Sequence, residues 1–144
     1  MAVYRIGVWR MAIRPRFLRA PLSVLYRWMF RRVRNVYGIE IPYTARVGQG
    51  VVIEHQSGIV VTHASVIGDQ CIIRQGVTLG IKSVRQRQGA PVLGRSVEVG
   101  VGAVLIGDVR VGDEARIGAN AAVVTDIPSG ATAVGVPARV VGGR

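Results

Sequence analysis

Residues 91–124 read PVLGRSVEVGVGAVLIGDVRVGDEARIGANAAVV, and a large aliphatic residue returns at every sixth position of this stretch. These positions are Leu93, Val99, Leu105, Val111, Ile117 and Val123. A helix would repeat apolar positions every three to four residues, and an ordinary half-buried strand every two. A period of six instead indicates short strands that meet at corners, each with one large side chain pointing inward.

The same period extends towards the N-terminus through Ile41, Val47, Ile53 and Ile59, and, after a shift of two residues, through Val61, Ile67, Ile73 and Leu79. Gly often follows the aliphatic position, and a small or β-branched residue, such as Cys71 or Ala103, stands four places after it. Successive coils of such a repeat stack at the ordinary strand spacing of ~4.8 Å. The pattern predicts an all-β domain over residues 38–144, a left-handed parallel β-helix of hexapeptide repeats.

Residues 81–91 interrupt the period with polar side chains, among them Lys82, Arg85 and Arg87. Because these side chains cannot enter the interior of a coil, the stretch is predicted to be extruded as a loop. Loops on rigid repeats are common sites of function.

Residues 1–37 form a different region, predicted to be a short, basic, amphipathic helical arm. Residues 1–36 hold nine Arg and no acid, whereas residues 37–144 are nearly balanced, with ten basic and eight acidic side chains. Pro15 and Pro21 predict breaks, so we expect one or two short helices, the better one near 22–35. Its apolar residues at helical spacing are Leu22, Leu25, Met29 and Val33.

Two roles are open for the arm: contact with an anionic membrane surface, or packing against the β-helix or a neighbouring subunit. Nucleic-acid binding is disfavoured because no recognised module accompanies the Arg residues. No uncharged stretch approaches the ~20 residues of a membrane span, and Arg interrupts every candidate signal-peptide core. The single Cys71 cannot form an internal disulfide and reads as a buried small residue. We expect a cytoplasmic location, at the inner face of the membrane if the arm binds lipid.

Residues 38–143 resemble the catalytic domain of serine acetyltransferases. The similarity is strongest in IEHQSGIVV (53–61), QGVTLG (75–80) and IGANAAVV (117–124), with the ending GVPAR (135–139). The long helical domain of those enzymes has no counterpart in the short arm. In this respect the chain is more similar to the colanic-acid type of polysaccharide O-acetyltransferase.

The resemblance implies transfer of an acetyl group from acetyl-CoA to a hydroxyl, with His55 as the general base. Imidazole suits that task near neutral pH. Glu40, one coil earlier, matches the acid that orients the imidazole, although the family has Asp there. Glu54 matches a substrate-side Asp, and His63 stands where the family usually has Glu, as a second base or a surface residue.

One departure bears on the acceptor. Serine acetyltransferases carry a His immediately before a Pro in the extruded loop, and the matching pair here is Ala90-Pro91. We therefore expect a saccharide acceptor from bacterial polysaccharide synthesis, bound by Glu54 and by Lys82, Arg85 and Arg87. Serine is the alternative acceptor.

The resemblance also implies a homotrimer that binds acetyl-CoA between adjacent β-helices. The matching positions are Gly80, Ile81, Val101, Ala119 and Arg139, and Arg139 is placed for a CoA phosphate. No metal is expected, because the carbonic anhydrases of this fold need three His at zinc and the chain has only two. A non-catalytic scaffold for other glycan enzymes is the alternative from another class.

Overall fold

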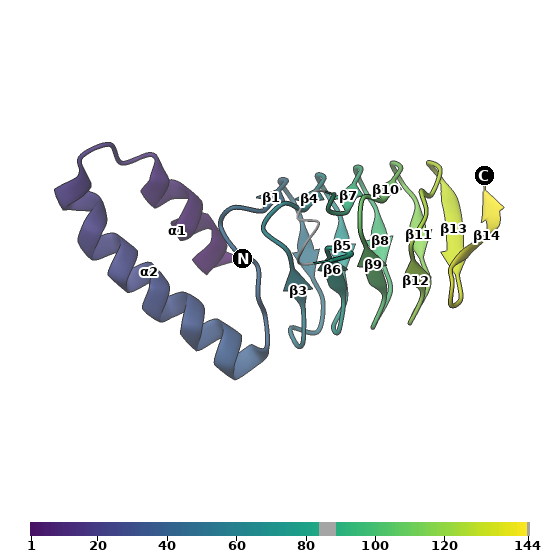
Figure 1. Ribbon diagram of the computed structural model, residues 1–144, viewed down its shortest axis with the longest axis horizontal. Coiled ribbons are helices and arrows are strands. Elements are labelled where there is room, and N and C mark those ends of the chain that lie inside the picture. Colours follow the sequence, from purple (N-terminus) through teal and green to yellow (C-terminus); the bar gives the residue numbers. More distant parts are fainter. Residues whose placement is uncertain (84–88, 144) are drawn as a thin grey trace.

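The chain folds into a helical hairpin followed by a stack of β-coils (Figure 1). The computed structural model describes residues 1–83 and 89–143. The hairpin consists of α1 (Ala2–Met11) and α2 (Arg16–Tyr37). The coils run away from the hairpin, so that the C-terminal strand β14 lies at the opposite end of the molecule (Figure 1).

The coils have three faces, each a sheet in which a strand pairs with its equivalents one coil away. The first face contains β1 (Arg46–Val47), β4 (Val66–Ile67), β7 (Val92–Leu93) and β10 (Arg110–Val111). The second contains β2 (Val52–Ile53), β5 (Ile72–Ile73), β8 (Glu98–Val99), β11 (Arg116–Ile117), β13 (Ala131–Val134) and β14 (Arg139–Gly143). The third contains β3 (Val60–Val61), β6 (Thr78–Gly80), β9 (Val104–Ile106) and β12 (Ala122–Val123).

Strand pairing is parallel throughout these sheets except between β13 and β14, which are antiparallel. The fold is the predicted left-handed parallel β-helix, preceded by helices. The strands flanking residues 81–91 keep the register of the stack, since Ile67 pairs with Leu93. The coils on either side of residues 81–91 are therefore stacked in register, and the extruded loop stays a prediction because residues 84–88 lie outside the described residues.

The hexapeptide positions form columns of side chains inside the coils. On the third face, Val61, Leu79, Leu105 and Val123 follow one another in register and are 0–2% exposed. Three expected positions differ, because Val51 and Ile53 are only half-buried and Ser57 is exposed. All three lie in the first full coil, close to the two-residue shift in the period.

Aspartates at the corners bind backbone N–H groups of the preceding coil. In each case an Asp Oδ1 accepts the bond: Asp69 from Gln49 at 2.6 Å, Asp113 from Arg95 at 2.7 Å and Asp126 from Arg110 at 2.8 Å. Asp113 also forms an ion pair with the Arg95 side chain. These bonds satisfy corner N–H groups that the strand ladders do not reach.

The helices differ from the prediction in where the second one begins. α2 starts at Arg16 and runs through Pro21, which was expected to break it. Proline removes one N–H and crowds the carbonyl four residues earlier, that of Phe17. Phe17 is highly exposed, so its carbonyl lies near solvent. The predicted apolar stripe is also partly wrong, because Leu25 is exposed and the buried residue of α2 is Tyr26.

The hairpin is held to itself and to the first coil by buried polar contacts. The Arg10 guanidinium lies over the rings of both Tyr26 and Tyr43, 4.5 Å from each centroid. The Tyr4 hydroxyl donates to the Ala45 carbonyl at 2.9 Å and accepts from the Val47 N–H at 3.0 Å. The hairpin thus packs on the β-helix, one of the two roles considered for the arm. Neither helix is long and apolar enough to cross a membrane, a statement limited to the described residues.

Candidate active site

His55 lies at an enlarged corner between the second and third faces. In the later coils the third-face strand begins six residues after the second-face strand, but β3 begins eight residues after β2. The two extra residues account for the shift in the period, and they enlarge the corner formed by residues 54–59. The His55 backbone adopts φ 53°, a left-handed conformation uncommon for a residue with a side chain. The corner thus presents an exposed imidazole outside the regular coil.

Glu54 is paired with Arg74, which lies at the equivalent position one coil further on. Ile53 pairs with Ile73 in the sheet, so the residues that follow them are neighbours. Arg74 Nε donates to Glu54 Oε2 at 2.9 Å, and the two side chains are 36% and 38% exposed. The predicted substrate residue Glu54 therefore lies beside His55 already joined to a guanidinium.

The backbone of Glu40 is hydrogen-bonded to the next coil, close to the corner that carries His55. Its N–H donates to the Ile59 carbonyl at 2.7 Å, and its carbonyl accepts from the Val61 N–H at 2.8 Å. These bonds hold Glu40 against the end of the enlarged corner, so it is a neighbour of the segment that carries His55. Within the described part of the chain, the Glu40 and His55 side chains form no hydrogen bond with each other. The orienting role of Glu40 stays a prediction.

The loop residues predicted to bind the acceptor lie at another corner. Lys82 follows β6 at the corner between the third and first faces and is exposed, while Ala90, at the end of the loop, is buried. Arg85 and Arg87 lie outside the described residues. His63 is exposed at this second corner, with its Nδ1 3.5 Å from Thr62 Oγ1. Within a single chain, His55 and the residues at the base of the predicted loop therefore lie at opposite ends of the third face.

The predicted acetyl-CoA positions are divided between the same two corners. Gly80 and Ile81 lie at the corner of the loop, where the Gly80 carbonyl accepts from the Gly107 N–H at 2.9 Å. Val101 and Ala119 lie at the corner of His55, in later coils. Arg139 begins β14 and is exposed, with Nη1 bonded to the Ala138 carbonyl at 3.0 Å. A single chain does not bring these five residues together.

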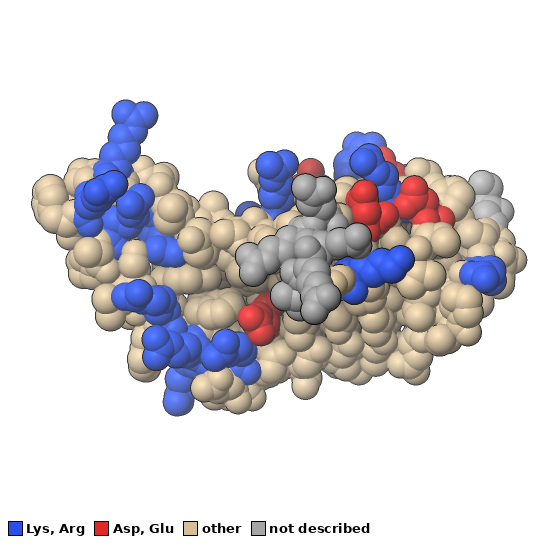
Figure 2. All heavy atoms as spheres, viewed as in Figure 1, with Lys and Arg blue, Asp and Glu red and all other residues tan. Residues whose placement is uncertain are grey.

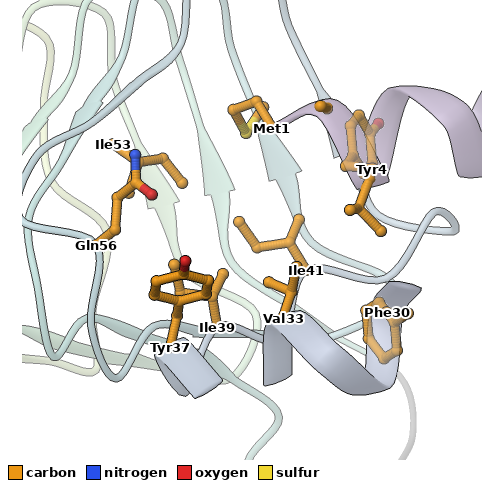
Figure 3. A pocket seen from close by; sticks show the side chains of 11 residues that line it. Met1, Tyr4, Phe30, Val33, Tyr37, Ile39, Ile41, Ile53 and Gln56 are labelled. Atoms are coloured by element: carbon orange, nitrogen blue, oxygen red, sulfur yellow. The ribbon is translucent and has the colours of Figure 1, made fainter. Parts of the chain in front are cut away.

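A cavity of about 290 Å³ separates the hairpin from the first coil, beside the corner of His55 (Figure 3). Phe30, Val33 and Tyr37 of α2 face Ile53 and Gln56 of the corner across it (Figure 3). Most of the lining is aliphatic or aromatic, so the cavity does not suit a small charged acceptor. Across residues 1–83 and 89–143, no three His, Cys, Asp or Glu side chains are grouped to hold a metal ion.

Comparison with known proteins gives one consistent family. The chain is 41% identical over 120 residues to the serine acetyltransferase of Synechococcus elongatus, covering 83% of this chain and 49% of that protein. It is 43% identical over 115 residues to the serine acetyltransferase of Helicobacter pylori strain J99, covering 80% of this chain and 67% of that protein. The chain belongs to the serine acetyltransferase family. No family model matches it.

Solved structures of this family agree with the fold. The soybean serine acetyltransferase apoenzyme superposes with a TM-score of 0.82 at 34% identity, covering 96% of this chain and 55% of that one. The Brucella abortus serine acetyltransferase, solved in complex with coenzyme A, gives a TM-score of 0.85 at 27% identity, covering 99% of this chain and 54% of that one. The chain therefore spans about half the length of most of these serine acetyltransferases. Because the match includes nearly all of this chain, the hairpin belongs to the shared architecture.

The sequence reasoning missed Arg74. The sequence feature that could have revealed it is a positive charge twenty residues after Glu54. The enlarged coil contains twenty residues, whereas a regular coil contains eighteen. Pairing opposite charges that lie twenty residues apart would have predicted the contact between Glu54 and Arg74.

Proposed function

We propose that this member of the serine acetyltransferase family transfers the acetyl group of acetyl-CoA to a hydroxyl, with His55 as the general base. The observation that carries the proposal is an exposed His at the corner between the second and third faces, which two extra residues enlarge, within a chain 41–43% identical to serine acetyltransferases. An imidazole outside the packed coil is accessible to both substrates.

In this mechanism a neutral His55 imidazole accepts the hydroxyl proton as the oxygen attacks the thioester carbon. The resulting tetrahedral oxyanion needs N–H donors, which the corner backbone would supply. Collapse of the intermediate breaks the carbon–sulfur bond, and the imidazolium returns its proton to the departing CoA thiolate. A carboxylate near the imidazole, the role assigned to Glu40, would stabilise the charged ring.

The acceptor is the point on which the sequence-based expectation is revised. A saccharide was the main expectation, but the relatives at 41% and 43% identity are named serine acetyltransferases. L-Serine is therefore the proposed acceptor. A saccharide remains the second candidate, because Ala90 occupies the place of the loop His through which the family engages serine.

We also propose that the active form is a homotrimer. His55, Val101 and Ala119 lie at one corner and Gly80, Ile81 and Lys82 at another, so one groove can contain both sets only between two copies. Sedimentation analysis with and without acetyl-CoA tests this proposal. A monomer that turns over acetyl-CoA would contradict it.

Contact of the arm with an anionic membrane is a further proposal. Trp9, Phe17 and Trp28 are 58–77% exposed, and Arg side chains gather over the hairpin end of the face seen in Figure 2. Nine Arg without an acid in residues 1–36 would repel a second hairpin but attract anionic lipid. The chain should sediment with phosphatidylserine vesicles at low salt, and not with phosphatidylcholine vesicles. Equal binding to both vesicle types would contradict the proposal.

The decisive experiment measures CoA release from acetyl-CoA with L-serine and with a panel of bacterial oligosaccharides. His55→Ala should lower kcat with the preferred acceptor about 10²- to 10⁴-fold, the usual contribution of a general base. The control is Arg116→Gln, which removes an exposed charge on the second face in a later coil and should retain activity. Release with an oligosaccharide alone would replace serine as the acceptor, and no release with any acceptor would favour the scaffold.

A further inference from the structure

Arg74 has hydrogen-bonding capacity that its partner does not use. Its Nε bonds to Glu54 Oε2 at 2.9 Å, and among the described residues its two Nη groups have no partner. A guanidinium carries five N–H donors in a planar fork that matches a carboxylate. The ion pair with Glu54 restricts the guanidinium, while a side chain about one-third exposed leaves the Nη groups within reach of a ligand.

The fork lies within one coil of the proposed base. Glu54 and Arg74 occupy equivalent positions in adjacent coils, about 4.8 Å apart along the stack. His55 follows Glu54 directly. In serine only the α- and β-carbons lie between the carboxylate and the hydroxyl oxygen. A serine with its hydroxyl at His55 can therefore reach a carboxylate site one coil away.

We infer that Arg74 binds the carboxylate of the acceptor, which makes the acceptor a hydroxy acid carrying a free carboxylate. This inference rests on the proposed acetyl transfer and deepens it. The paired Glu54 has a second oxygen, Oε1, without a partner among the described residues, and it can receive the acceptor's ammonium group. The two side chains together form a zwitterion-binding pair matched to an α-amino acid.

The inference also explains how an amino acid could be held without the loop His. Ala90 offers no polar group and is buried. Arg74 directly follows β5, a strand paired on both sides, so it would position the carboxylate from the rigid stack rather than from the loop. Arg74 is thus a specificity-determining residue in place of a loop contact.

The test compares Arg74→Gln and Arg74→Lys with the wild type in the CoA-release assay. Loss of a charge-assisted contact to a carboxylate should raise the KM for L-serine about 10- to 100-fold in Arg74→Gln, with a smaller rise in Arg74→Lys. The KM for acetyl-CoA should stay within about twofold, because the proposed contact of Arg74 is with the acceptor carboxylate and not with acetyl-CoA. L-Serinamide, which lacks the carboxylate, should lose affinity in the wild type and respond little to either substitution.

Arg116→Gln is the matched control, because Arg116 pairs with Glu98 across the same sheet at 3.7 Å but lies in coils away from His55. It should leave the KM for L-serine unchanged. Calorimetry of L-serine binding separates the two proposals. Serine that binds wild type but not Arg74→Gln, without turnover, would refute acetyl transfer to serine and support the carboxylate site. An unchanged KM in a folded, active Arg74→Gln would overturn the inference and leave the proposed function intact.

Discussion

Leu105→Ala tests whether the sixfold columns determine stability. Leu105 is fully buried, between Leu79 and Val123 of the adjacent coils. Removing three carbons costs roughly 2.4 kcal/mol at ~0.8 kcal/mol per buried methylene. A residual cavity brings measured Leu→Ala losses to about 2.7–5.0 kcal/mol. Because both neighbours are fixed by strand pairing, the column can collapse little, and we expect about 3–5 kcal/mol.

The measurement is guanidinium unfolding followed by circular dichroism, at fixed protein concentration because oligomerisation would add to the apparent stability. In a thermal scan the same loss should lower Tm by roughly 10 °C or more. Val124→Ala is the control, since Val124 follows β12, the strand paired with that of Leu105, but is 54% exposed, and it should stay within about 0.5 kcal/mol of wild type. A Leu105→Ala loss below about 1 kcal/mol would refute the column as a close-packed core.

Three other predictions concern the stack. Gly68→Ala should destabilise the fold by several kcal/mol, because its Cβ would overlap the Gly94 backbone of the next coil, whereas Gly142→Ala meets nothing within 4 Å; equal unfolding midpoints for the two would contradict this. Burial raises the pKa of the Cys71 thiol, so iodoacetamide should label it only after denaturation, and rapid labelling of the native chain would disprove its burial. The bonds from the Arg95 N–H and side chain lower the pKa of Asp113, so its carboxylate stabilises the fold above the unfolded pKa of about 4. Asp113→Asn should thus be less stable than wild type at pH 7, and the difference in stability should disappear as the pH falls through the lowered pKa of the folded state. A difference that does not depend on pH would show that the charge of Asp113 is not what stabilises the fold.

Periodicity predicted the β-helix because every coil repeats the same short-range requirement, an inward aliphatic side chain and a small partner. The hairpin obeys no such repeat. Pro21 reads as a helix breaker, yet α2 runs through it, and beyond it the helix is packed through Tyr26 against Arg10 and Tyr43. Arg10 reads as a surface charge, but the Tyr26 and Tyr43 rings and a hydrogen bond to Ser23 Oγ hold its guanidinium in a buried position.

The candidate site likewise contains residues that the sequence could locate and residues that it could not. His55 could be found from the sequence because a family motif and a two-residue shift in the period coincide there. Arg74 could not be found from a regular eighteen-residue coil, since the enlarged corner alters the interval between neighbours. The prediction that Glu40 orients His55 depends on side-chain conformations that the backbone register does not determine.

The unbroken register across residues 81–91 has a consequence for how acceptors could change in evolution. Strand β7 pairs with β4 and β10 in the regular register although residues 81–91 are inserted before it. Residues 81–91 can therefore lengthen, shorten or be replaced without a change of fold. Replacing residues 81–91 with the corresponding segment of a relative that uses another acceptor would test this directly. In such a scaffold this segment and side chains of the stack such as Arg74 can each change the substrate range, while the strand pairs that stabilise the stack stay the same.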